Sequence, residues 1–218
     1  KLARKLTERF PDLFMEGCSG GGGRYDLGMM KFFPQIWCSD NTDAQARCRI
    51  QYGSSLAYPL SVSSNHVSIC PNHQTGRTIS FKTRGHVAML GAYGYELNPK
   101  YLSDEDRDFI RVQTAEYRAM QHLVLEGDLY RLSSPFDSDV FCFELVAKDK
   151  SEVRVTAMRF TLRNAEPPLR IYPRGLDENA VYTYGESRYT GRTLMHAGID
   201  LPEFKGDNDS VVVTLKKV

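Results

Sequence analysis

The sequence predicts an α/β unit followed by an all-β unit, and a change in hydrophobic pattern separates the two. Up to about residue 128, short apolar runs alternate four times with helix-like segments, as in βα units around a parallel sheet. After Leu132, apolar and polar residues alternate with a period of two, between turn sequences such as Pro167-Pro168. We therefore expect βα units over residues 1–128 and an antiparallel β-sandwich over residues 129–218.

The first unit begins with a helix, because Leu2, Leu6 and Phe10 recur every four residues and Pro11 ends the pattern. The predicted strands are residues 13–17, 33–37, 56–62 and 92–97. Asn41 or Thr42 is expected to cap the helix after the second strand, and residues 80–90 are expected to form another.

The strongest helix signal follows Ser103, a capping residue. Acidic residues fill the first turn, where the helix dipole favours negative charge, and Gly127 marks the end. Its predicted apolar side consists of Phe109, Val112, Met120 and Leu123.

In the second unit, the alternation predicts which side chains share a face of a strand. Phe141, Phe143 and Leu145 oppose Cys142 and Glu144. Similar alternation occurs around Val153 and Val155, and around Val211 and Val213.

Residues 13–43 form the predicted functional region, because its two apolar runs end in polar residues, Cys18 and Asp40. In a parallel βα sheet, polar residues at the C-terminal ends of strands are typical of a site. Between the runs, Gly20–Gly23 permits positive φ or close approach of another molecule or backbone; the alternative is a flexible turn. A phosphate-binding loop is disfavoured, since Arg24 and Tyr25 follow where a Lys-Ser/Thr pair or another glycine is required.

The motifs CSGGGGRYDLGM, PQIWCSDNTDA, IQYGSSLAYP, HVSICPNHQTGR and GYEL occur in this order and resemble the family 36 glycoside hydrolases, the retaining α-galactosidases. The resemblance is dense from Leu13 to Leu132 and thin from Ser133 to Val218. It implies the C-terminal half of a (β/α)8 TIM barrel, followed by a β-sandwich, within a longer polypeptide.

The resemblance implies that Asp40 is the general acid/base, matching the first Asp of a Trp-x-Ser-Asp motif. From the residues alone, the favoured role of Asp40 is to cap the helix that begins near Thr42. Retaining glycosidases need a second carboxylate as nucleophile, roughly 5 to 5.5 Å from the first. The resemblance places this nucleophile in a Lys-x-Asp motif at the tip of an earlier strand, and none is found there, so we expect this chain to supply the acid/base without the nucleophile.

The resemblance also assigns Cys18 and Gly20 to galactose binding, and Trp37 is a candidate for stacking on a sugar face. The alternatives are a small buried thiol for Cys18 and a core side chain for Trp37. Arg24 and Asp26 are expected to pair and brace the glycine loop, unless both are solvated.

His66 and His73, with Cys70 between them, suggest metal ligation only weakly, because a zinc site wants four well-spaced ligands. We interpret both histidines as hydrogen-bonding groups that order a loop near the site. The family uses no metal, and we expect no metal and no cofactor.

The composition of the chain disfavours some classes of binding partner. The formal net charge is +1 with basic residues spread along the chain, which disfavours a nucleic-acid partner, and no apolar run reaches the length of a membrane span. Five cysteines without a CxxC pair favour a reducing, cytoplasmic location. We expect an α-galactoside substrate, no nucleic acid, no membrane, and a homo-oligomer of the complete polypeptide.

The functional prediction is retaining hydrolysis of terminal α-D-galactosyl residues from melibiose- or raffinose-type oligosaccharides. Two alternatives remain: a catalytically inactive sugar-binding or assembly fragment, and a galactosyl-transferring relative.

Overall fold

The computed structural model describes residues 1–218 and contains a four-stranded parallel sheet and a six-stranded antiparallel sheet. The parallel strands lie side by side in chain order: β1 (Glu16–Gly17), β2 (Gln35–Trp37), β3 (Ser63–Ser68) and β4 (Ala92–Glu96). The helices of this part are α1 (Leu2–Arg9), α2 (Ser19–Gly22), α3 (Leu27–Met30), α4 (Ala44–Ser55), α5 (Phe81–Ala88) and α6 (Asp104–Glu126), with 3-10 turns η1 (Leu60–Val62) and η2 (Pro99–Tyr101).

The antiparallel sheet has the strand order β10-β9-β12-β7-β6-β5. Its strands are β5 (Asp128–Ser133), β6 (Val140–Val146), β7 (Glu152–Arg159), β9 (Val181–Tyr184), β10 (Ser187–Thr190) and β12 (Asp209–Lys217). A two-stranded sheet of β8 (Arg170–Ile171) and β11 (Ile199–Asp200) and the helix α7 (Gly191–Ala197) complete the chain. The α/β and antiparallel β parts are thus both present, as predicted.

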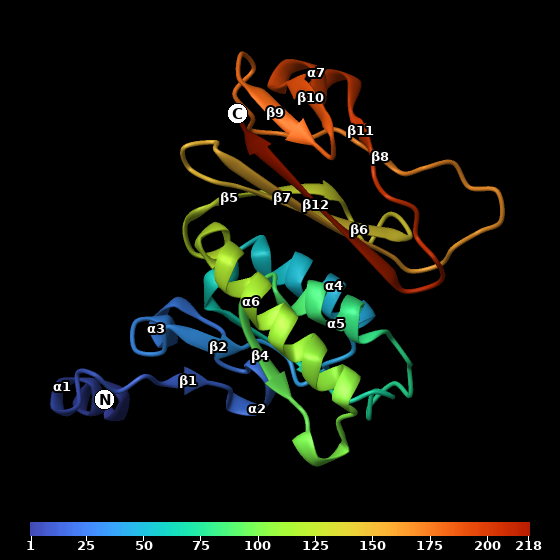
Figure 1. Ribbon diagram of the computed structural model, residues 1–218. Coiled ribbons are helices and arrows are strands. Elements are labelled where there is room, and N and C mark those ends of the chain that lie inside the picture. Colours follow the sequence, from blue (N-terminus) through green and yellow to red (C-terminus); the bar gives the residue numbers. More distant parts are fainter.

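Helices α4, α5 and α6 lie between the two sheets (Figure 1). Phe141 and Phe143 of β6 are fully buried in one cluster with Cys48 of α4 and Leu123 of α6. The other face of the antiparallel sheet buries Cys142 in a second cluster that includes Leu194 of α7. The antiparallel sheet therefore shares one core with the βα part and a second core with the β8–β11 layer.

Local signals identified α6 correctly. The Ser103 side chain accepts a hydrogen bond from the Asp106 amide, Asp106 reciprocates as a capping box, and Gly127 follows the last residue. The predicted apolar face was only partly right: Met120 and Leu123 are buried, but Val112 is 64% exposed. The buried face instead includes Gln113 and Tyr117, which have hydrogen-bond partners on α5 and on Gly91.

The prediction of a strand at residues 56–62 is wrong. Leu56 is 67% exposed, and the strand is the polar segment Ser63–Ser68, which is almost entirely buried. Burial is tolerated because the polar groups have partners: the Asn65 amide donates to the Leu90 carbonyl at 2.8 Å, and Ser63 donates to Asn65. The Leu90 carbonyl is 25 residues from Asn65 in sequence, so no local pattern reveals this strand.

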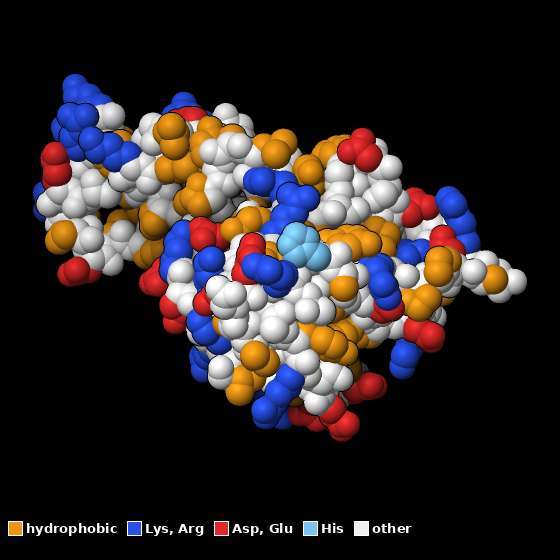
Figure 2. All heavy atoms as spheres, turned by 90° about the horizontal axis from the view of Figure 1, so that it is seen from above, with side chains coloured by type: hydrophobic (Ala, Val, Ile, Leu, Met, Phe, Trp, Pro, Cys, Tyr) orange, Lys and Arg blue, Asp and Glu red, His pale blue; other side chains and the backbone are white.

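The chain's surface carries mixed charges. Lys and Arg side chains are interspersed with Asp and Glu over most of the face in Figure 2, in keeping with the net charge of +1. None of the helices combines the length and the apolar character needed to cross a membrane. All five cysteines are free thiols.

Glu144 is a fully buried acid on the face of β6 that packs against the β8–β11 layer. Its Oε2 accepts a hydrogen bond from the Arg174 amide at 2.8 Å, whereas its Oε1 has no partner. Burial raises the pKa of Glu144 to about 8, despite the hydrogen bond from Arg174. The folded protein therefore holds this carboxyl protonated at neutral pH.

Replacing Glu144 with Gln should stabilise the protein increasingly as pH rises. The folded pKa of Glu144, about 8, exceeds its unfolded value of 4.5, so the wild type loses stability between these pH values while Gln does not titrate. The stability gain at pH 8 should exceed that at pH 5 by on the order of 3 kcal/mol. Denaturant unfolding of both proteins at the two pH values measures it; a pH-independent difference would contradict the assignment.

Candidate active site

The two polar tips predicted from the sequence lie next to each other at the C-terminal edge of the parallel sheet. β1 and β2 pair with Gly17 opposite Ile36, which brings Cys18 level with Trp37. Asp40 follows β2 by three residues. Parallel strands present their C-terminal ends on one edge, so this edge collects Cys18, the glycine loop and Asp40.

The Asp40 carboxyl is exposed and is held by a single side chain, since its Oδ1 accepts a hydrogen bond from the indole Nε1–H of Trp37 at 2.8 Å. Asp40 does not cap the helix that follows. Helix α4 is capped by Asp43, whose Oδ1 accepts from the Ala46 amide at 2.9 Å, so the expected cap at Asn41 or Thr42 is also wrong. Asp40 is thus free of a structural role in α4.

Asp43 is a second acid nearby, but its oxygens are already used. Its side chain is 1% exposed and pairs with Arg77 at 2.5 Å, while Oδ2 accepts from the Thr75 hydroxyl. A cap with a buried ion pair fits a structural function. Asp40 and Asp43 have similar surroundings in the sequence, and only these contacts distinguish the structural aspartate from the candidate catalytic one.

The glycine loop packs its backbone directly on the segment that leads to Asp40. Gly20, Gly21 and Gly22 all have positive φ, between +69° and +94°. A Cβ at Gly21 would lie 2.9 Å from both Cγ and Oδ2 of Asp40, and one at Gly22 would lie 2.4 Å from the Cys38 carbonyl oxygen. Of the uses predicted for this loop, close approach of another backbone is the one observed.

The expected Arg24–Asp26 pair is absent. Asp26 caps the short helix α3 by accepting a hydrogen bond from the Met29 amide at 3.0 Å, and Arg24 is exposed. The Asp26 carboxylate therefore caps α3 and does not form an ion pair with Arg24.

The Trp37 ring is packed rather than open. It is 7% exposed, stacks on the His66 ring with centroids 4.6 Å apart, and lies 4.6 Å from the Arg47 guanidinium carbon. Burial lowers the pKa of His66, although Glu16 and Glu96 act in the opposite direction. The indole therefore meets the site through its N–H, which binds Asp40.

The proposed loop-ordering role of the histidines is wrong. His66 lies in β3, and His73 is exposed without a side-chain hydrogen bond. Asn72 orders this loop instead, because its Oδ1 accepts from the amides of Gln74 and Thr75. No three His, Cys, Asp or Glu side chains come together as a metal site.

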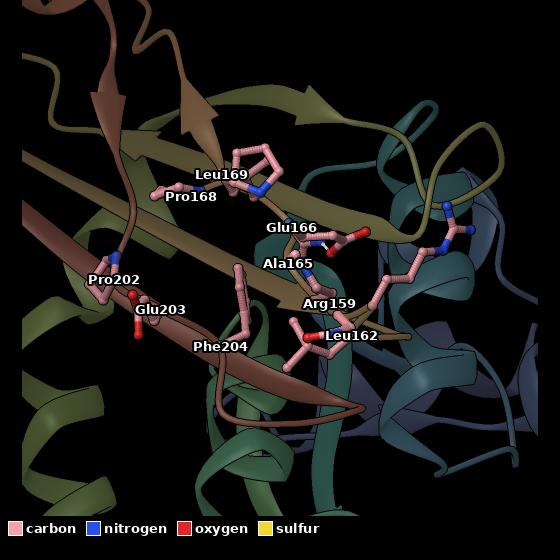
Figure 3. Close-up of a pocket in the computed structure, with 12 residues that line it drawn as sticks. Arg159, Leu162, Ala165, Glu166, Pro168, Leu169, Pro202, Glu203 and Phe204 are labelled. Atoms are coloured by element: carbon pink, nitrogen blue, oxygen red, sulfur yellow. Dashed lines mark ion pairs between the residues drawn. The ribbon is translucent and has the colours of Figure 1, made fainter.

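A cavity of about 470 Å³ lies elsewhere, outside the antiparallel sheet, between the proline-containing loop 162–169 and residues 202–204 (Figure 3). Glu166 of that loop forms an ion pair with the buried Arg159 of β7, whose guanidinium lies over the Phe204 ring at 5.2 Å. The residues that line this cavity include neither Asp40 nor the glycine loop.

Asp40 and the glycine loop lie at the edge of a parallel βα sheet where such proteins place their sites. Glycoside hydrolases require a pair of carboxyl groups in this position, of which Asp40 can supply one. Residues 1–127 match the Melibiase family, and residues 140–215 match the glycosyl hydrolase family 36 C-terminal domain. The chain belongs to this family, glycoside hydrolase family 36.

Relatives of known name extend this match. The chain is 49% identical to the bifunctional α-galactosidase/sucrose kinase AgaSK of Mediterraneibacter gnavus over 92% of its length and 22% of the relative's. It is 46% identical to α-galactosidase AgaA of Geobacillus stearothermophilus over 100% of its length and 30% of the relative's. The crystal structure of an AgaA variant with raffinose superposes with a TM-score of 0.96 at 43% identity, covering 100% of this chain and 30% of that one. The chain thus spans less than a third of these relatives.

Proposed function

We propose that this chain is part of a retaining α-galactosidase that removes terminal α-D-galactosyl residues from melibiose- and raffinose-type oligosaccharides. Asp40 carries the proposal: a carboxyl at the expected sheet edge, fixed by Trp37 and released from helix capping. The raffinose complex of AgaA supports the substrate class. The relatives are more than three times as long, and the nucleophile, with the remaining four βα units of a TIM barrel, is proposed to come from the rest of such a polypeptide.

The contacts of Asp40 support different tasks for its two oxygens in this proposal. Oδ1 accepts the Trp37 N–H, so the proton of the acid form resides on Oδ2. Oδ2 lies over the glycine loop, where the missing Cβ of Gly21 leaves space beside it. In the first step Oδ2–H protonates the leaving oxygen, and in the second the carboxylate takes a proton from the attacking water.

Other assignments follow from the same edge. Cys18 is exposed next to the glycine loop and Gly20 is exposed within it; both are proposed to contact the galactosyl group. Trp37 contributes through its hydrogen bond to Asp40. We place the barrel portion at residues 1–128 and a sandwich-like β domain at residues 129–218, in a cytoplasmic homo-oligomer.

The test is hydrolysis of raffinose by the complete enzyme, meaning the α-galactosidase polypeptide that contains these 218 residues. Proton NMR of the first-formed product should show α-galactose, because two displacements retain configuration. Initial β-galactose would refute retention. Binding without turnover would indicate the inactive sugar-binding alternative, and longer galactosides formed in excess over galactose would indicate transfer.

The β domain should carry no catalytic group. Its candidate acids bind nearby surface groups: Asp177 pairs with Lys217, Glu178 with Arg192, and Asp207 accepts from the Leu162 amide. Replacing each acid with Ala should leave kcat/KM of the complete enzyme within about twofold, roughly 0.5 kcal/mol of barrier. A hundredfold loss at any of the three would place part of the chemistry in this domain.

A further inference from the structure

Arg47 of α4 is an unusual cation, because it is 2% exposed and takes part in none of the chain's ion pairs. Burying an unpaired charge is costly unless polar groups replace the lost water. Its Nη2 donates to the Ser64 carbonyl at 2.6 Å, and Nη1 contacts Cys38 Sγ at 3.1 Å and the Ser39 carbonyl at 3.4 Å. Its Nε has no partner.

The remaining compensation comes from the Trp37 ring, 4.6 Å from the guanidinium carbon. Desolvated cation–π contacts of this kind are among the stronger ones. The cation draws electron density from the indole and so makes its N–H a better donor, in the way that linked hydrogen bonds polarise one another. That N–H is the group that holds Asp40.

A second path from Arg47 to Asp40 runs through the backbone. The guanidinium joins Ser39, next to Asp40 in the chain, to Ser64 of β3. This fixes the exit of β2 against the neighbouring strand, so the Asp40 main chain and its hydrogen-bond donor are set by one side chain.

We infer that Arg47 is the positioning residue of the general acid/base: it orients Asp40 through Trp37 and the Ser39 carbonyl. This inference rests on the proposed α-galactosidase function. The titratable groups around it are Cys38, Tyr25, His66 and Arg84, the last of which lines the same small cavity as Arg47. Burial raises the pKa of Tyr25 to about 12, and burial lowers the pKa of His66, so neither supplies a competing charge at neutral pH.

The test is a double-mutant cycle in the complete enzyme with Arg47→Met, Trp37→Phe and the double variant. Each single change should lower kcat for melibiose about a hundredfold, the cost of a misplaced catalytic group, with KM changed far less. Because both act on the same hydrogen bond, the double variant should lose no more than about tenfold beyond the worse single one. Independent, multiplicative losses would overturn the inference.

The conservative variant separates positioning from a general packing defect. Arg47→Lys keeps a cation beside the Trp37 ring and should recover part of the kcat that Arg47→Met loses. Arg49→Met is the matched control, since Arg49 is an exposed arginine on the same helix that lies over Phe160 instead. Equal losses of kcat in Arg47→Lys and Arg47→Met would contradict the role of the cation, and a comparable loss in Arg49→Met would contradict a role specific to Arg47.

Two measures keep the inference testable independently of activity and of folding. In a crystal structure of the Arg47→Met protein, the Trp37–Asp40 hydrogen bond should be lost or lengthened, and an unchanged bond would overturn the inference even if the wild type proves inactive on α-galactosides. If Arg47→Met does not fold, Arg47→Gln, which also removes the charge but keeps a hydrogen-bond donor, replaces it in both the cycle and the structure.

Discussion

Replacing Asp40 with Ala in the complete enzyme should lower kcat/KM for melibiose by several orders of magnitude, because general acid and general base assistance each contribute about 10²–10⁴-fold. Sugar leaving groups need protonation to depart, so kcat/KM should fall most for substrates whose leaving group is a sugar. An aryl galactoside with a good leaving group departs without help, and its glycosylation step should be largely spared. Water then attacks slowly without a base, and the covalent intermediate should accumulate as a burst.

Azide should restore turnover of the aryl substrate by the Asp40→Ala enzyme, because it is a nucleophile that requires no general base. The product should be α-galactosyl azide, which NMR identifies. Asp43→Asn is the matched comparison: Asp43 is buried in a structural ion pair, so its loss should lower stability without azide rescue. A β-configured azide from Asp40→Ala would mark Asp40 as the nucleophile, and absence of rescue would remove it from the mechanism.

Replacing Gly21 with Ala should lower kcat about a hundredfold, the order expected when a catalytic group is displaced by roughly an ångström. The new Cβ would lie 2.9 Å from Cγ and Oδ2 of Asp40 and 3.0 Å from its amide nitrogen, so the carboxyl must move. Steady-state kinetics with melibiose measures the loss.

The control for Gly21→Ala is Gly76→Ala. Gly76 has a similar φ, +68°, but no atom within 4 Å of the position of its Cβ. It should show only the backbone strain, about 1–2 kcal/mol, with kcat unchanged. Equal kinetic losses in the two variants would show that the glycine loop has no specific relation to Asp40.

The sequence was most informative where local chemistry decides the structure. The capping box at Ser103 fixes the start of α6, and alternation around Val153 and Val155 fixes β7, because both depend on neighbours within a few residues. The order of the motifs indicated the family, and the matches to both family 36 domains confirm it. The acid/base role of Asp40 remains a prediction.

The sequence-based predictions were wrong where hydrogen-bond partners distant in sequence decide the structure. Ser63–Ser68 looks like a loop, yet it is a buried strand because Asn65 reaches the Leu90 carbonyl and Ser68 the Thr42 carbonyl. The sequence gives no signal for Arg47, because the Ser64 carbonyl and the Trp37 ring that its guanidinium contacts lie outside α4.

By itself, the sequence determined the order of elements, the family and the edge on which Asp40 lies, because these follow from short-range pattern and from motifs. Tertiary structure alone decided that Asp43, and not Asp40, caps α4. It further decided that the backbone of Gly21 and Gly22 packs against the Asp40 segment, and that Arg47 donates a hydrogen bond to the Ser39 carbonyl next to Asp40. It also decided that β6 and β7 share a core with α4 and α6. These features depend on which residues become neighbours when chain segments pack, and packing energies act between atoms in contact, whatever their separation in sequence.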